Sequence, residues 1–340
     1  MAAAQPVRWG VLGVAKIATK KVIPAMQQST LTPVMAIASR QLPKAQEAAA
    51  ALGIPKAYGS YEDLLADPDI DAIYNPLPNH LHVPWSIRAA EAGKHVLCEK
   101  PLGLSSREVS QLIAVRDRTG VCIGEAFMVH THPQWLRVRD LIRGGRIGAL
   151  RSVFGYFSYF LSDPANVRCV PQWGGGALMD IGCYPVHCSR FIFGEEPRRV
   201  VGLVEKHPQW NVDILTSAML DYPSGQCIFT CGMQVVPYQR MQFYGTKGRI
   251  EIEIPFNAPP DRPCLIQVDD GGDLSGSTIT TESIPVCDQY TVQGAAFSRA
   301  VRGLEPVPVS LEDSMRNMCV LEAIFSSAAA GTWVNLPAAS

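Results

Sequence analysis

An apolar segment, residues 8–12, leads directly into a glycine turn and a helical pattern, and this order constrains the fold more than any other feature. The turn reads Gly13-Val-Ala15-Lys-Ile-Ala18, which has the spacing of the G-x-G-x-x-G dinucleotide fingerprint with alanine at its second and third places. The third substitution is within the pattern, but Ala15 sets a Cβ where glycine would let the backbone approach a pyrophosphate. Alone, the motif fits an ordinary strand-to-helix turn equally well.

The next apolar segment, residues 34–38, completes a strand–helix–strand unit and favours the dinucleotide interpretation. It ends at Ser39-Arg40, about 20 residues beyond the turn, where NAD-preferring folds place an acid for the ribose 2′-hydroxyl. No acid stands at 39–41. Ser39 offers a hydrogen bond and Arg40 a planar cation, which suit a 2′-phosphate. The sequence therefore predicts NADP(H) over NAD(H), the alternative for Arg40 being an exposed side chain at a strand end.

The alternation of helices and strands continues to residue 125 and predicts a Rossmann-like parallel sheet over 1–125. The segments expected to form it are helices at 46–52, 61–65, 84–92 and 105–119 and strands at 70–74, 95–97 and 121–124. Ser105 and Glu108 form a capping box at the start of the last of these helices. The first domain is therefore an open α/β sheet, which binds ligands at the carboxyl ends of its strands.

Two loops follow strands of this sheet and supply candidate site residues. Residues 75–82 form a proline-braced loop that we expect to line a nicotinamide pocket. His80 and His82 have a spacing that metal ligands use, but no third ligand is evident and we interpret them as loop histidines beside a cofactor. In Cys98-Glu99-Lys100-Pro101 the proline turns the backbone and aims Lys100 outward. A lone loop lysine is usually only solvated, yet here we predict Lys100 to be catalytic.

Residues 126–340 have a different pattern, typical of a second α/β domain. Residues 150–160 alternate as an aromatic strand of period two, and further strands are expected at 198–205, 213–221, 226–234, 240–244 and 249–254. Because these strands are mostly consecutive, we expect an open, largely antiparallel sheet. We expect this half, residues 126–340, to bind the substrate.

A glycine run at 174–176 precedes the segment that we expect to carry the chemistry. If residues 177–193 are helical, Asp180, Tyr184 and His187 share one face. Gly182 and Pro185 predict a kink, because proline disrupts a helix beyond its first turn.

Composition narrows the class of partner. The 340 residues carry 30 Lys+Arg against 31 Asp+Glu, so no overall basic field favours nucleic acid or acidic lipid. No segment has the ~18 to 20 apolar residues that span a membrane, and the start lacks a secretory pattern. Ten scattered cysteines indicate reduced thiols. We expect a cytoplasmic protein with a small-molecule substrate.

Several motifs, in order along the chain, carry a resemblance to a known family. They are Gly13-x-Ala15-x-x-Ala18, Ser39-Arg40, Asn75-Pro76-x-x-x-His80, Glu99-Lys100-Pro101, Glu125-Ala126-Phe127-Met128 and Gly174-Gly-Gly-Ala-Leu-Met-Asp180-Ile-Gly-Cys-Tyr184. Over nearly its whole length the chain resembles the Gfo/Idh/MocA oxidoreductases. Within them it is most similar to the glucose-fructose oxidoreductase, dimeric dihydrodiol dehydrogenase and D-xylose 1-dehydrogenase group, which has tyrosine at the place of Tyr184 where many relatives have histidine.

The resemblance implies a mechanism and a set of site residues. We predict Tyr184 as the acid/base, Lys100 as the cation that polarises the substrate oxygen and favours the phenolate, and Asp180 as the group that orients a sugar hydroxyl. The predicted cofactor-binding residues are Gly13, Val14, Ala15, Lys16, Ile17, Ser39, Arg40, Pro76, Leu77, Asn79, His82, Glu99, Lys100, Arg168 and Trp173. The predicted substrate contacts are Lys100, Asp180, Tyr184, Tyr156 and Tyr290. No metal is expected, and a homodimer through the second sheet is implied.

The function that follows is NADP-dependent hydride transfer to or from a sugar, either from a cyclic aldose to a lactone or between an aldose and a ketose. The alternatives are a trans-diol or inositol dehydrogenase and a non-catalytic NADP-binding regulator on the same fold, since fold does not fix function. Lys100, Asp180 and Tyr184 together favour an enzyme.

Overall fold

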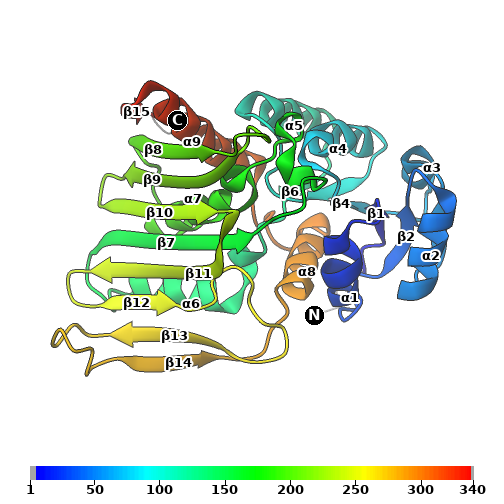
Figure 1. Cartoon of the computed structure of the whole chain (residues 1–340). Helices are drawn as coiled ribbons and strands as arrows, with labels where there is room; N and C mark the ends of the chain where they lie inside the picture. Colours follow the sequence, from blue (N-terminus) through cyan, green and yellow to red (C-terminus); the bar gives the residue numbers. More distant parts are fainter. Residues whose placement is uncertain (1–4, 338–340) are drawn as a thin grey trace. The chain divides into compact units, whose positions relative to one another are not determined.

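The computed structural model describes residues 5–337 and divides into two compact units (Figure 1). The first joins Met1–Thr131 to Asp288–Met315, and the second joins His132–Cys287 to Arg316–Ser340. We expected a single division at residue 125, with residues 288–315 in the second domain. They pack instead with the first unit, where Trp9 Nε1 donates to Ser298 Oγ at 3.2 Å and the rings of Trp9 and Phe297 lie 5.6 Å apart.

The first unit contains the expected parallel sheet, with the strand order β3-β2-β1-β4-β5-β6. The strands are β1 (Trp9–Leu12), β2 (Val34–Ala38), β3 (Lys56–Tyr58), β4 (Ala72–Asn75), β5 (His95–Cys98) and β6 (Ile123–Glu125). Because β1 and β4 are buried along their whole length, these strands are apolar runs rather than alternating ones, as in sheets covered on both faces.

The first unit also contains helices and short turns, most of which connect these strands. They are η1 (Ala18–Val22), α1 (Ile23–Met26), α2 (Leu42–Leu52), α3 (Tyr61–Ala66), η2 (Asn79–Leu81), α4 (His82–Glu91), α5 (Ser106–Thr119), η3 (Met128–Thr131) and, from the later part of the chain, α8 (Gln289–Val301). Ser105 caps α5 as expected, since its Oγ accepts from Glu108 N at 3.3 Å, while the carboxylate of Glu108 accepts from Leu104 N at 2.8 Å.

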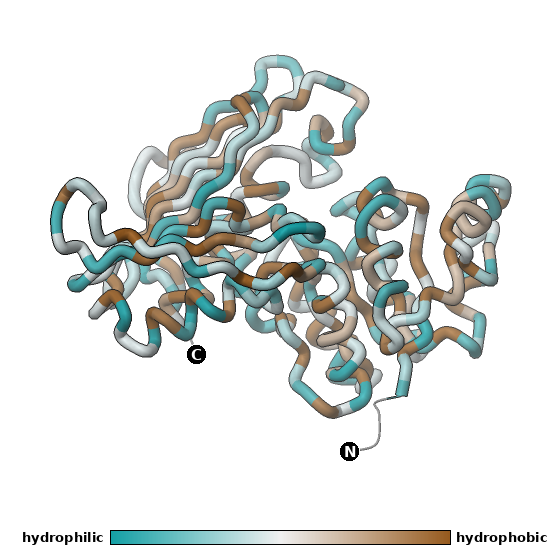
Figure 2. The backbone as a smooth tube through the Cα atoms, turned by 90° about the horizontal axis from the view of Figure 1, so that it is seen from below, coloured by the Kyte–Doolittle hydropathy of each residue, from teal (hydrophilic) through white to brown (hydrophobic). Residues whose placement is uncertain are grey.

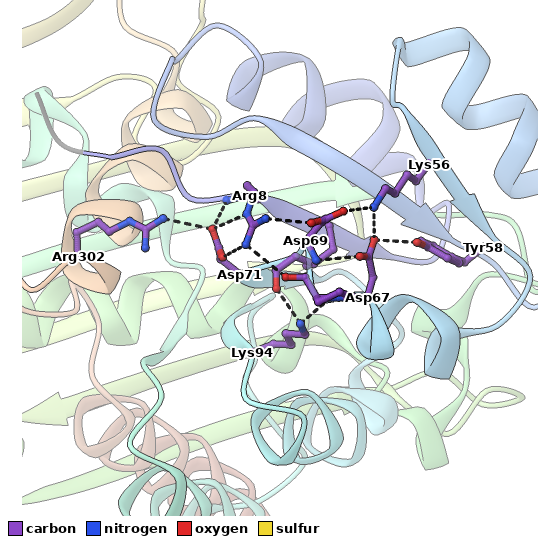
Figure 3. A network of polar contacts seen from close by, with 10 residues as sticks. Arg8, Lys56, Tyr58, Asp67, Asp69, Asp71, Lys94 and Arg302 are labelled. Carbon is purple, nitrogen blue, oxygen red and sulfur yellow. Dashed lines mark hydrogen bonds and ion pairs between the residues drawn. The ribbon is translucent and has the colours of Figure 1, made fainter.

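A network of charged side chains closes the edge where the parallel strands begin (Figure 3). Asp71, just before β4, accepts from Arg8 at 2.7 Å and from Arg302, beyond α8, at 3.2 Å. Asp67 accepts from Lys56 at 2.9 Å and from the Tyr58 hydroxyl at 2.8 Å. This edge is therefore occupied by structural ion pairs, and the opposite edge, at the carboxyl ends of the strands, carries the candidate site.

The second unit contains a nine-stranded sheet with the order β14-β13-β12-β11-β7-β10-β9-β8-β15. Its strands are β7 (Leu150–Phe160), β8 (Arg199–Lys206), β9 (Asp213–Asp221), β10 (Gln226–Gly232), β11 (Gln234–Gly245), β12 (Arg249–Ile252), β13 (Cys264–Asp269), β14 (Thr280–Ile284) and β15 (Val334–Asn335). All neighbours pair antiparallel except β7 and β10, which are parallel. The expected largely antiparallel sheet is confirmed.

Helices α6 (Pro133–Arg143), α7 (Cys183–Phe193) and α9 (Leu311–Ala330) lie along one face of this sheet (Figure 1). A Cβ at Gly155 in β7 would lie 3.1 Å from Pro185 of α7, and one at Gly202 in β8 would lie 2.8 Å from Ile324 of α9. Because side chains alternate along a strand, the residues next to these glycines point to the face of the sheet that the helices do not cover. Hydrophobic and polar residues follow one another along the strands (Figure 2). Among residues 5–337 the structure contains no helix long and apolar enough to span a bilayer.

Candidate active site

The glycine turn after β1 has the geometry that its motif predicts. Gly13 is buried, has a φ of +80° and donates from its backbone N to Ala38 O at 2.8 Å. A Cβ at this position would lie 3.0 Å from Leu77 Cδ2, so only glycine fits both the left-handed backbone and the close approach. The following chain turns into a helix through the π turn η1, and helix starts leave amides that can bind phosphate.

Ser39 and Arg40 follow β2 at the same edge of the sheet. Ser39 is buried, and its Oγ accepts from Gln41 N at 3.3 Å. Arg40 is exposed, and no residue in the described range 5–337 forms an ion pair with its guanidinium. An exposed, unneutralised cation at the end of β2 fits a 2′-phosphate and offers nothing specific to a 2′-hydroxyl.

The loop after β4 is held by buried polar side chains. Asn75 donates from Nδ2 to His82 O at 3.0 Å and to Ser86 Oγ at 3.2 Å, and its Oδ1 accepts from Leu77 N at 3.3 Å. The loop is thereby fixed before any ligand binds.

His82 is 1% exposed and connects this loop to the next one. Its Nδ1 lies 2.8 Å from Pro101 O and its Nε2 lies 2.6 Å from Leu77 O. Burial lowers the pKa of His82 to about 4, although both carbonyls favour its protonated form. We predicted His82 as a cofactor contact, whereas the structure buries it and places both ring nitrogens against the backbone.

The loop after β5 carries Glu99 and Lys100, joined to Pro101 by a cis peptide bond. Tyr74, which is fully buried in β4, donates its hydroxyl to Glu99 Oε1 at 2.6 Å, and Glu99 Oε2 accepts from Lys100 N at 3.3 Å. Tyr290 of α8 lies near the same carboxylate, since burial first and Glu99 second raise the pKa of Tyr290. Glu99 therefore fixes the backbone that presents Lys100.

In the second unit, two side chains converge on Asp180. Arg168 Nε and the Tyr159 hydroxyl each donate to Asp180 Oδ2 at 2.7 Å. The charge of Asp180 raises the pKa of Arg168, while burial and then Asp180 raise the pKa of Tyr159. We predicted Arg168 as a cofactor contact, and the structure pairs it with the proposed catalytic carboxylate.

The glycine run shapes the segment that brings Arg168 to this position. Gly176 N donates to Arg168 O at 3.0 Å, and a Cβ at Gly175 would lie 2.4 Å from the same oxygen. Trp173, in the short turn η5 (Pro171–Trp173) just before the run, is 39% exposed. The glycines therefore allow two backbone segments to touch.

Tyr184 follows Asp180 across a change of helix type. Asp180 lies in the π turn η6 (Leu178–Gly182), and Tyr184 lies in the first turn of α7, where Pro185 is tolerated. Its ring is 5% exposed and packs on Phe157 at 5.8 Å and Phe256 at 5.3 Å between centroids. The expected kink is thus a π turn, a feature frequent at functional sites.

Tyr156 does not belong to this group, and the prediction that it contacts substrate is corrected. Phe157 and Tyr159 point from β7 toward Tyr184 and Asp180, so Tyr156 points to the opposite face of the sheet. There its ring lies 5.8 Å from that of Tyr238. The residue that reaches Asp180 is Tyr159, which strand alternation could have selected once Phe157 was assigned to the helix face.

Two family models match the chain in the same order as these two units. "Oxidoreductase family, NAD-binding Rossmann fold" matches residues 7–127, and "GFO/IDH/MocA C-terminal domain" matches residues 135–251. The chain belongs to the Gfo/Idh/MocA oxidoreductase family. This confirms the predicted family, the enzyme class and a nicotinamide dinucleotide as cofactor.

Individual relatives of the family cover almost the whole chain. An uncharacterized oxidoreductase of Rhizobium meliloti is 45% identical over 328 residues, 96% of this chain and 98% of the relative. The D-xylose 1-dehydrogenase (NADP(+)) 2 of Haloferax volcanii is 40% identical over 96% of this chain and 99% of its own. A 3-ketoreductase from Actinomadura kijaniata, solved with NADP and TDP-benzene, is 31% identical with a TM-score of 0.88, covering 95% of this chain and 98% of that one.

Sequence reasoning missed residues that act through hydrogen bonds with distant segments. Tyr74 is a buried strand residue whose partner, Glu99, lies in the loop after β5, and nothing in the local pattern separates it from a packing residue. Within the described part of the chain, no three His, Cys, Asp or Glu side chains form a group that could hold a metal ion.

Proposed function

We propose that this protein is an NADP(H)-dependent oxidoreductase that moves a hydride between nicotinamide and a carbinol carbon of a sugar. The observation that carries the proposal is the polar group of Asp180, Arg168 and Tyr159 beside the buried Tyr184. Such a group supplies hydrogen-bond acceptors and donors for a polyol next to a residue able to transfer a proton. The names of the xylose dehydrogenase and the ketoreductase support a sugar.

The first unit binds the cofactor in this proposal. The turn at Gly13 and the residues after it hold the pyrophosphate, and Ser39 and Arg40 hold the 2′-phosphate. The remaining proposed contacts lie on the loops after β4 and β5, together with Trp173 of the second unit: Pro76, Leu77, Asn79, Glu99 and Trp173. Bound NADP(H) supplies or accepts the hydride at its nicotinamide ring.

Proton transfer falls to the protein. Tyr184 takes the hydroxyl proton during oxidation and returns it during reduction, which places the proton on the phenolic oxygen. Lys100 Nζ polarises the same substrate oxygen, and Asp180 accepts a hydrogen bond from a neighbouring sugar hydroxyl. Tyr290, beside Glu99, is a further proposed substrate contact. Lys100 and Tyr184 belong to different units, so the proposal requires both to reach one hydroxyl.

We also propose a homodimer through the face of the second sheet that α6, α7 and α9 leave uncovered. Apolar side chains are exposed there: Phe154 by 39%, Leu203 by 76% and Leu265 by 41%. A broad sheet face with apolar side chains on several strands suits pairing with its own copy about a two-fold axis. Leu203→Glu is expected to yield monomers in sedimentation, and an unchanged dimer would contradict this interface.

All ten cysteines are free thiols, which supports the cytoplasm as the proposed location.

A substrate screen tests the proposed function. Purified protein is incubated with NADP⁺ or NAD⁺ and with aldoses, inositols and trans-diols, and nicotinamide reduction is followed by absorbance. We expect reduction of NADP⁺ by at least one cyclic aldose, with a lactone as product. Reduction by inositols or trans-diols alone would overturn the sugar assignment, and tight NADP(H) binding without turnover of any polyol would overturn the enzyme assignment.

A further inference from the structure

Asp213, the first residue of β9, is a buried carboxylate that the proposed reaction does not use. The residue is 3% exposed. Its Oδ2 accepts from Leu178 N at 2.6 Å and from Thr216 Oγ1 at 3.0 Å. Burial raises the pKa of Asp213, while the hydrogen bonds from Leu178 and Thr216 oppose that shift. Burying a carboxylate is unfavourable unless hydrogen bonds offset the lost hydration, so the contacts of Asp213 indicate what it does.

The first contact is with the start of the helical segment that bears the site. Leu178 begins the π turn η6 and lies two residues before Asp180. The first amides of a helix have no partner within the helix, and a carboxylate there satisfies one of them and interacts favourably with the helix dipole. Asp213 therefore caps this helical segment from strand β9, and it lies 35 residues after Leu178 in the chain.

The second contact of Asp213 explains why glycine stands at position 176, directly before the helical segment. A Cβ at Gly176 would lie 1.9 Å from Asp213 Oδ1, and the φ of Gly176 is +113°. Gly176 also donates its N–H to Arg168 O at 3.0 Å. One glycine thus touches both the carboxylate of Asp213 and the segment whose arginine holds Asp180.

We propose that Asp213 is a positioning residue for the active site: through Leu178 and Gly176 it sets where the π turn begins and hence where Arg168 and Asp180 meet. The carboxylate of Asp213 and Gly176 act as a pair, because the carboxylate occupies the space that a Cβ at position 176 would need. The inference rests on the proposed function only in taking Asp180 and Tyr184 as the groups that face the substrate.

The test compares Asp213→Ala, which removes the acceptor, with Asp213→Asn, which keeps an oxygen for the Leu178 N–H. For Asp213→Ala we expect kcat/KM for the sugar to fall about 10- to 100-fold, the range of an unsatisfied buried donor, with the NADP dissociation constant changed less than about 2-fold. Asp213→Asn should recover most of the loss. Thr216→Val is the matched control, because it removes the other donor to Oδ2 and leaves the helix contact, and it should retain kcat/KM within about 3-fold.

A double-mutant cycle keeps the proposal falsifiable if Asp213→Ala folds poorly. Gly176→Ala alone should be strongly impaired, because its Cβ meets the Asp213 carboxylate and its φ of +113° strains alanine. Adding Asp213→Ala should relieve the clash with the carboxylate, so the double variant should lose less than the sum of the two single losses. Strict additivity of the two effects would overturn the pairing.

Amide hydrogen exchange separates this proposal from the proposed function. We expect faster exchange over residues 177–184 in Asp213→Ala than in the wild type, with exchange in the first unit unchanged. Unchanged exchange over 177–184, or unchanged kcat/KM in an active enzyme, would overturn the role of Asp213. If the wild type oxidises no sugar, the proposed function fails while the exchange result still decides on Asp213.

Discussion

Arg168 donates its Nε–H to Asp180 at 2.7 Å across an ion pair in which the aspartate side chain is 11% exposed and the arginine 42%. The arginine comes from a 3-10 turn, η4 (Val167–Cys169), and the aspartate from a π turn, so neither belongs to a regular element. The pairing joins the segment before the glycine run to the helix after it. We infer that Arg168 orients the carboxylate of Asp180 on the substrate side of the proposed site.

Replacement of Arg168 by Gln tests that assignment. Loss of the charge should let Asp180 reorient, and we expect the KM for the sugar to rise about 10-fold, equivalent to about 1.4 kcal/mol, with NADP affinity within about 2-fold of the wild type. Arg168→Lys is the matched control for charge without the planar fork. A weakened NADP affinity with an unchanged KM for the sugar would instead show that Arg168 contacts the cofactor, and would contradict a role at the substrate.

Replacement of Arg40 by Ala should remove the preference for the phosphorylated cofactor. The dissociation constant of NADPH is expected to rise about 10- to 100-fold, as for loss of hydrogen bonds to a charged group, while that of NADH changes little. Titration of cofactor fluorescence measures both constants. Equal weakening of NADPH and NADH would show that Arg40 does not contact a 2′-phosphate.

Replacement of His82 by Gln should remove a pH-dependent part of the stability. The folded pKa of His82 is about 4, below the 6.5 of a free histidine, so the unfolded chain binds the extra proton as the pH falls through this interval. The contribution is complete above about pH 6.5 and is lost toward pH 4, by up to about 3 kcal/mol. Glutamine does not titrate and can donate to one of the two carbonyls, as a neutral imidazole does, so urea denaturation of His82→Gln should show a flatter pH profile. The same slope in both proteins would contradict the assignment.

Replacement of Asp67 by Asn tests the network in Figure 3. Burial opposes ionisation, but the hydrogen bonds from Lys56, Asp69 N and Tyr58 together hold the pKa of Asp67 at about 2, below its ordinary 3.8. Ionised Asp67 therefore stabilises the fold above about pH 4, and this contribution is lost as the pH falls toward 2. We expect Asp67→Asn to cost about 1 to 2 kcal/mol at neutral pH and progressively less in acid. Leu304→Ser, at an exposed position outside both this network and the proposed dimer interface, serves as a control without this trend.

Regular elements with a strong local pattern could be predicted from the sequence. The strand expected at 213–221 is β9 as observed, and the helix expected at 105–119 is α5, with Ser105 as its capping residue. The hairpin of β13 and β14 was not anticipated, because the edge strand β14 is mostly polar and lacks the apolar alternation that indicates a half-buried strand.

The site could be predicted where one motif holds all its parts, and not where partners come from distant segments. Asp180 and Tyr184 stand in one motif. The predicted contact Tyr156 lies three residues before Tyr159, and an odd shift along a strand moves a side chain to the other face. Asp213 had no local signal, because an acid at the start of an apolar strand looks the same whether or not it caps a remote helix.

Hydride transfer from an aldose that is active in the screen to NADP⁺, measured in a single turnover with the wild type and Tyr184→Phe, tests the central claim most directly. Loss of the proton acceptor should slow the transfer about 10²- to 10⁴-fold, while the NADP dissociation constant and the unfolding midpoint stay unchanged. A Tyr184→Phe enzyme that reduces NADP⁺ at the wild-type rate would contradict the account.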